Sequence, residues 1–285
     1  MSLKEIKTRI ASVAGTRKTT SAMKMVSSVK LRKAQQSIQY ALPYVEQLDH
    51  ILESLSTVPD AGRISPLVVE RPVRNVALVC FSSDSSLCGG FNANIIRHSR
   101  SVIAEIMKTD DTPHIYTIGQ KITDSLGKLG YGIDRGYSGM MAKRLYADAA
   151  SLADDLMDMF RQGQLDRVVL SYTHFVSPGC QKVVDEQLLP VSVPQAHGEA
   201  GTDYILEPSA QELMERLLPK VIRMKLYRAV LDSYASEQAA RVVAMQAATE
   251  NADRLTQELT LQYNKLRQQA ITNELLDLAG GLQNE

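Results

Sequence analysis

The sequence has no tryptophan, and aromatic residues make up only 5% of its 285 positions. A globular core usually relies on aromatic side chains, because each buries a large apolar area. Helix breakers are also missing from one stretch, since Lys220 to Ala279 contains neither glycine nor proline. Helices of soluble proteins average about 11–12 residues. The two shortages together predict a protein built around very long helices.

Net charge, cysteine pairs and membrane spans are absent too. Thirty-two basic residues balance thirty-two acidic ones, so the overall charge indicates no partner. Cys80, Cys88 and Cys180 form no CxxC pair, which favours reduced thiols in a cytoplasmic protein. No apolar run approaches the ~20 residues of a membrane span, and the first residues show no signal-peptide pattern. We therefore expect no direct membrane insertion.

Catalytic motifs are missing as well. The sequence has no GxxxxGK[ST] phosphate loop and no GxGxxG after its first predicted strand. The five histidines are scattered, and none pairs with another at ligand spacing. Cys88-Gly89-Gly90 is the one place to suspect a nucleotide, but no lysine or second acid accompanies it. The chain by itself is predicted to be no enzyme, with no catalytic residue, no cofactor and no metal.

The C-terminal segment carries both helix-end signals. Ser209 with Glu212 three residues later fits a capping box, which predicts the start of the helix. Gly280-Gly281 predicts its end, because glycine tolerates the left-handed turn after a helix. Such a helix would be roughly 100 Å long. It is therefore expected to be a rod rather than part of one compact domain.

A second long helix is predicted from Leu3 to about Ser56. Ile6, Ile10 and Val13 follow the 4-3 spacing of a coiled-coil seam, and Ala22, Val26 and Val29 are expected to repeat it after a slip in register. Pro43 is expected to kink or split this helix. The pattern predicts a coiled-coil partner along most of its length.

Between the two helices, the spacing of apolar residues is in turn that of a strand and that of a helix. This alternation predicts a partly parallel α/β sheet. The predicted strands are 73–81, 114–118, 167–175 and 181–191, and the predicted helices are 92–107, 120–129 and 142–161.

The predicted fold is of mixed α+β and α/β class: a long antiparallel coiled coil of the terminal helices with an inserted Rossmann-like α/β domain. The expected domains are 1–58, 70–195 and 207–285. The C-terminal helix should extend past the N-terminus from about Asn264. Tyr263 is then expected beside the chain start.

Basic residues are concentrated at the N-terminal end. Residues 1–33 carry nine basic side chains and one acidic side chain, Glu5. Three interpretations fit this excess: a solvated helix face, a nucleic-acid contact or a contact with an acidic protein surface. No nucleic-acid motif is present and no aromatic side chains interleave the cations, which favours the acidic protein.

Four segments resemble the gamma subunits of F-type ATP synthases of the bacterial type. They are SLKEIKTRIASVAGTRKTTSAMKMVSSVKLRKAQ, SSDSSLCGGFNANI, DYILEPS and YNKLRQQAITNELLDLAGG, the last with Ile271 to Glu274 intact. The chain departs from the family pattern at Ser85 and Ser86, where Arg-Gly is usual, at Asp277, and at Leu278-Ala279. The resemblance covers both long helices closely and the inserted domain loosely.

The resemblance implies a central rotor shaft that transmits torque between a proton-driven c-ring and the catalytic beta subunits during ATP synthesis. It implies that Met23, Lys24, Lys30 and Arg32 face acidic loops of beta. It also implies that Arg267 and Gln268, at the overhanging tip of the C-terminal helix, contact the beta subunits in the ring of alpha and beta subunits. Tyr204 and Glu207 are implied contacts of epsilon or the c-ring.

The implied partners are the alpha and beta subunits, epsilon and the c-ring, with no nucleic acid. The implied location is the cytoplasmic face of the bacterial plasma membrane, as a peripheral protein. The competing hypotheses are a static coiled-coil scaffold or nucleic-acid tether, and a nucleotide-binding enzyme that uses the α/β domain.

Overall fold

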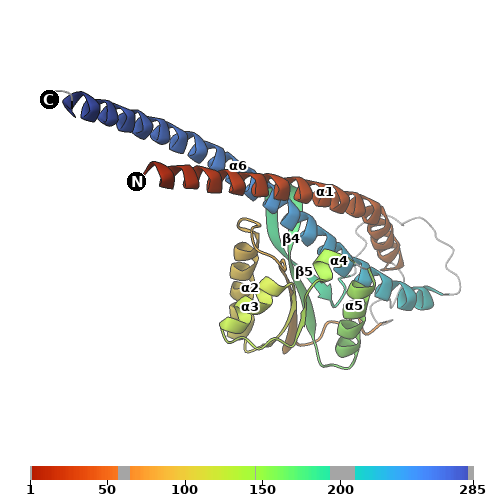
Figure 1. Ribbon diagram of the computed structural model, residues 1–285. Helices are drawn as coiled ribbons and strands as arrows, with labels where there is room; N and C mark the ends of the chain where they lie inside the picture. The colour runs from red at the N-terminus through yellow and green to blue at the C-terminus, as the bar shows by residue number, and fades with distance from the viewer. Residues whose placement is uncertain (1, 57–64, 145, 193–208, 282–285) are drawn as a thin grey trace. The chain divides into compact units, whose positions relative to one another are not determined.

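The computed structural model describes residues 2–56, 65–144, 146–192 and 209–281. Two long helices, α1 and α6, enclose in the sequence a segment of alternating strands and shorter helices (Figure 1). The elements in chain order are α1 (Leu3–Ser56), β1 (Asn75–Phe81), α2 (Phe91–Lys108), β2 (Thr112–Ile118), α3 (Gln120–Lys128), β3 (Arg135–Tyr137), α4 (Met140–Lys143), α5 (Tyr146–Arg161), β4 (Arg167–Ser177), β5 (Cys180–Leu189) and α6 (Ala210–Gly281).

The chain forms two compact units, and each long helix contributes to both. Unit 1 consists of Met1–Ser28 with Arg241–Glu285. Unit 2 consists of Val29–Ala240 and contains the whole sheet. The predicted domain boundaries at 58, 70, 195 and 207 stay a prediction.

Both long helices begin at side-chain caps. The Glu212 amide donates to Ser209 Oγ at 3.2 Å, as the capping-box pattern predicts for α6. At α1 the capping box is reciprocal: the Ser2 amide donates to Glu5 Oε2 at 2.8 Å, and the Glu5 amide donates to Ser2 Oγ at 3.3 Å. These bonds satisfy amides that have no partner within the helix.

The helix ends differ from expectation in two places. α1 continues through Pro43 to Ser56, so this proline does not split the helix. α6 includes Gly280 and Gly281, two residues beyond the predicted end.

The sheet has five strands in the order β3-β2-β1-β4-β5. β1 pairs in parallel with β2 and β4, and β2 pairs in parallel with β3. β4 and β5 form an antiparallel hairpin at one edge. The predicted partly parallel α/β sheet is therefore confirmed.

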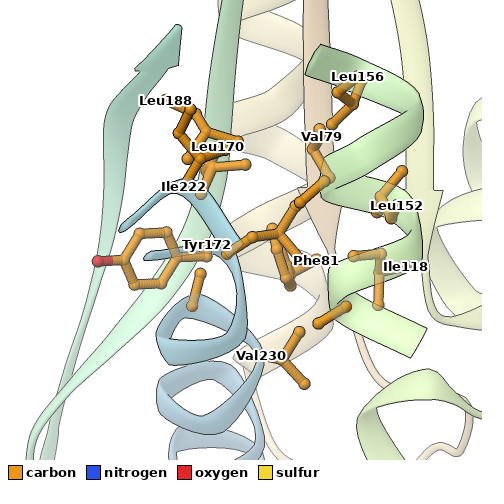
Figure 2. Packing of buried hydrophobic residues seen from close by; sticks show 14 of the residues in the cluster. Val79, Phe81, Ile118, Leu152, Leu156, Leu170, Tyr172, Leu188, Ile222 and Val230 are labelled. Atoms are coloured by element: carbon orange, nitrogen blue, oxygen red, sulfur yellow. The ribbon is translucent and has the colours of Figure 1, made fainter. Parts of the chain in front are cut away.

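Helices cover both faces of the sheet. Successive residues of a strand point to opposite faces of the sheet, so β1 contributes to two cores. On one face, Leu78 and Cys80 pack with residues of α2 and α3. Val79 and Phe81 pack on the other face with α5 and α6, and Figure 2 shows them beside Leu152 of α5 and Val230 of α6. The α6 stretch inside unit 2 is thus a core helix of the sheet.

Two elements correct the prediction. Strand β3 was not expected; it is three residues long and mostly exposed, so it lacks the apolar run by which a strand is recognised. The single helix predicted over 142–161 is two helices, α4 and α5. Arg144 between them has φ 53°, which is incompatible with a continuous right-handed helix.

Candidate functional site

The two helices of unit 1 are paired by polar contacts. The Arg17 guanidinium contacts the Asp253 carboxylate. The hydroxyls of Thr20 and Thr249 lie 2.8 Å apart, and Lys24 Nζ donates to Gln246 Oε1 at 2.5 Å. As the residue number rises on α1 it falls on α6, so the pairing is antiparallel, as predicted. The same register, extended to the start of α1, places Leu3 opposite Arg267. Tyr263 was expected at this position, so the observed partner lies about four residues later in α6.

The seam of α1 does not slip. Positions 6, 10, 13, 20, 24 and 27 are all buried or half-buried and keep one heptad spacing. Val26 is 55% exposed and Val29 is 58% exposed, so these valines face outward. The expected slip to Ala22, Val26 and Val29 is wrong because Thr20, Lys24 and Ser27 continue the seam. The spacing of apolar residues alone could not reveal a seam that continues through polar side chains.

The predicted beta-facing residues lie on more than one side of α1. Met23 and Lys30 are seven residues apart, so they point within about 20° of each other. Arg32 is nine residues from Met23 and points about 180° away. Lys24 is half-buried and bonded to Gln246. Only Met23 and Lys30 therefore share one face.

The other predicted contacts lie on α6 or outside the described residues. Arg267 and Gln268 are both exposed on α6. Tyr204 and Glu207 lie outside the described residues.

The polar side chains of the loop after β1 form hydrogen bonds with neighbouring elements. Asn92 Nδ2 donates to Ser83 Oγ at 2.8 Å and to Cys88 Sγ at 3.1 Å. The Asp84 carboxylate accepts the Gln120 amide at 3.1 Å and the Gly139 amide at 3.2 Å. These side chains tie the loop to α2, α3 and the turn before α4. The Cys88-Gly89-Gly90 turn thus has a structural explanation that needs no nucleotide.

The Cys80 thiol of β1 is buried, whereas the Cys180 thiol of β5 is exposed. Burial raises the pKa of the Cys80 thiol to about 12, which keeps it protonated and unreactive. No group of three or more acidic, histidine or cysteine side chains is placed to hold a metal ion within the described ranges. Among these same ranges, no helix has the length and apolar character needed to cross a membrane.

A polar contact between β4 and α6 was missed by sequence reasoning. His174 Nδ1 and Asp232 Oδ2 lie 2.8 Å apart, and the Asp232 side chain is only 4% exposed. Burial raises the pKa of Asp232, and the hydrogen bond from His174 partly opposes that rise. Ser236 Oγ also donates to the Thr173 carbonyl at 3.0 Å. The two residues of the pair are 58 positions apart, so no local spacing could reveal them.

The fold and these contacts define a class: a paired-helix shaft that carries an α/β unit and, among its described residues, no arrangement suited to catalysis. A family described as ATP synthase matches residues 2–284. The chain is 49% identical to ATP synthase gamma chains of Phocaeicola vulgatus and Bacteroides fragilis, over 98% of each chain. It therefore belongs to the ATP synthase gamma chain family.

Solved structures support the fold. The rotor of the Euglena gracilis mitochondrial ATP synthase matches with a TM-score of 0.65 at 16% identity, over 94% of this chain and 98% of that one. The central stalk of the Tetrahymena thermophila mitochondrial ATP synthase matches with a TM-score of 0.56 at 20% identity, over 80% and 98%.

Family membership confirms the main functional predictions. The chain is a non-catalytic subunit of the F1 sector of an ATP synthase, with the role of central rotor, and catalysis resides in the beta subunits. The scaffold, nucleic-acid tether and nucleotide-binding enzyme hypotheses are not favoured.

Proposed function

We propose that the shaft passes torque to the beta subunits through the Met23–Lys30 face of α1. The observation that carries this proposal is the charge pattern of α1, which has no acidic side chain between Glu5 and Glu46. An exposed cation beside a half-buried methionine suits a moving contact with an acidic loop, because the attraction needs no fixed geometry. Arg267 and Gln268 supply a polar contact on α6.

The proposed partners are the alpha and beta subunits around unit 1, with epsilon and the c-ring at the other end of the shaft. Tyr204 and Glu207 are proposed contacts of epsilon or the c-ring. The proposed location is the cytoplasmic face of the bacterial plasma membrane. Each beta site is then biased in turn by the face of the shaft that it meets, which is a difference in contact free energy between conformations.

Replacing Met23 by lysine tests this face. We expect Met23→Lys to leave assembly intact and to lower the ratio of proton transport to ATP hydrolysis in membrane vesicles, because it adds a strong new charge interaction at the moving contact. A single alanine change at Lys30 should be nearly silent, since exposed charge pairs contribute about 0–1 kcal/mol.

Met25→Lys is the matched control. Met25 is 62% exposed on the same helix and points about 160° away from Met23. Its ratio should match the wild type. Equal losses in Met23→Lys and Met25→Lys would show a general effect of added charge, and an unchanged ratio in Met23→Lys would mean that torque passes elsewhere. Lys30→Glu should also lower the ratio, because it reverses the exposed charge of the same face.

A further inference from the structure

A hollow of about 380 Å³ opens between α1 and β4 within unit 2. Its volume lies in the range of small-molecule pockets, about 300–1,000 Å³. The lining residues are Arg32, Gln35, Gln36, Ile38, Gln39 and Phe175. The three glutamines stand three, four and seven residues after the arginine, so these four polar side chains share one stripe of α1. The hollow is therefore lined by a polar helix stripe with two apolar side chains beside it.

The polar groups of this lining are unpaired. Within the described residues, the Arg32 guanidinium and the three glutamine amides form no hydrogen bond or ion pair with another residue. A glutamine amide carries two donor hydrogens and an acceptor oxygen, and a guanidinium carries five donor hydrogens. The six lining residues include no carboxylate. A ligand in the hollow would thus meet paired donors and acceptors together with one positive charge.

The apolar part of the lining is anchored in the core. Phe175 and Ile38 are partly buried and pack against the large apolar cluster of unit 2, so the core holds them in place. Aromatic rings of this kind are the surfaces on which nucleic-acid bases stack, often with an apolar side chain beside them. Arg32 and Gln39 are seven residues apart, so the polar stripe extends over about 10 Å. A base and a phosphate can therefore be contacted at its two ends.

We propose that this hollow binds an adenine mononucleotide. The base stacks on Phe175 beside Ile38, and the phosphate pairs with Arg32, because a guanidinium matches the geometry of phosphate oxygens. Gln39, at the other end of the stripe, pairs with the edge of the base, since glutamine favours the donor and acceptor pattern of adenine. The lining has no carboxylate to hold Mg²⁺, so the site is suited to binding rather than to hydrolysis.

Isothermal titration calorimetry of the full chain with AMP, adenosine and inosine monophosphate tests the proposal. We expect AMP to bind about tenfold more tightly than adenosine, because a hydrogen bond to a charged group adds that much. AMP should also bind about tenfold more tightly than inosine monophosphate, which has an oxygen in place of the amino group of adenine. Arg32→Gln should remove only the first preference and Gln39→Leu only the second. Phe175→Ala should weaken all three ligands about tenfold.

Lys18→Gln and Gln47→Leu are the matched controls, because both residues are exposed on α1 outside the hollow. Their affinities for the three ligands should equal those of the wild type. Binding of AMP no tighter than that of adenosine and inosine monophosphate would overturn the proposal. So would equal losses in Lys18→Gln and Arg32→Gln, which indicate general charge attraction, or tighter binding of oligoadenylate than of AMP, which indicates a nucleic-acid surface. The site uses neither Met23 nor Lys30, so none of these outcomes bears on the Met23→Lys experiment.

Discussion

Different kinds of internal contact stabilise the two compact units. In unit 2, large apolar side chains such as Phe81, Phe160 and Ile222 are fully buried between the sheet and its helices. In unit 1, fewer apolar side chains are buried, among them Ile6 and Leu259. The polar contacts between its helices include an exposed ion pair, a pair of threonines and a lysine–glutamine bond. Burying one large apolar side chain contributes about 1.5–3 kcal/mol, whereas an exposed ion pair contributes about 0–1 kcal/mol. Stability is thus concentrated in unit 2, and unit 1 is left with polar surface for partners.

The largest expected effect comes from removing a core ring of unit 2. Phe81 is fully buried and packs edge-on against Tyr172, with 6.1 Å between ring centroids. Phe81→Ala should lower the free energy of unfolding by about 3–5 kcal/mol, because it leaves a cavity. Denaturant titration followed by circular dichroism measures this loss. Tyr40→Ala, at an exposed aromatic position, should change it by less than about 0.5 kcal/mol, and similar losses in both variants would contradict the contrast.

A somewhat smaller loss is expected from a backbone clash at the edge of the same core. Gly119 has φ 102°, and a Cβ there would lie 2.0 Å from the Ser82 carbonyl oxygen. Gly119→Ala should cost about 2–4 kcal/mol, since both the backbone conformation and the close approach resist a side chain. Gly132→Ala is the control, because no atom lies within 4 Å of its Cβ position. Equal thermal midpoints for the two variants would rule out this explanation.

The buried polar contact of unit 2 should give a pH-dependent effect. Burial raises the pKa of Asp232 above its ordinary 3.8, so the folded chain holds this proton to a higher pH than the unfolded chain does. The stabilisation given by protonation is then present at low pH and lost as the pH rises through the raised pKa.

Asn at position 232 cannot ionise but can still accept from His174. The stability of Asp232→Asn relative to the wild type should therefore increase from pH 3.8 upward and level off above the raised pKa. Urea unfolding midpoints at a series of pH values measure this difference. A difference that stays constant over the whole series would show that Asp232 titrates normally in the folded chain.

The smallest effect belongs to unit 1. Arg17 and Asp253 are both about half exposed in their side chains, so solvent screens their attraction. A double-mutant cycle with Arg17→Ala and Asp253→Ala should give a coupling energy below about 1 kcal/mol that disappears in high salt. A coupling above about 2 kcal/mol would mean that unit 1 depends on its ion pair, against the comparison drawn above.

Local signals in the sequence predicted the elements well where one residue type decides the outcome. Ser209 and Glu212 predicted the start of α6, because a cap acts over three residues. The apolar run before Phe81 predicted β1, since a strand buried on both faces needs one. β3 and the break at Arg144 were missed: a short exposed strand leaves no apolar pattern, and arginine is not a residue that favours a positive φ.

The sequence by itself determined that this protein has two long helices around an α/β segment, that its N-terminal helix is basic, and that its motifs are those of an ATP synthase gamma chain. These properties depend on spacing and composition within continuous stretches. Only the tertiary structure decided that the α1 seam runs on through Thr20, Lys24 and Ser27, and that His174 meets Asp232. Each of these depends on a register between segments far apart in the chain, and side-chain packing across α1, β4 and α6 sets that register.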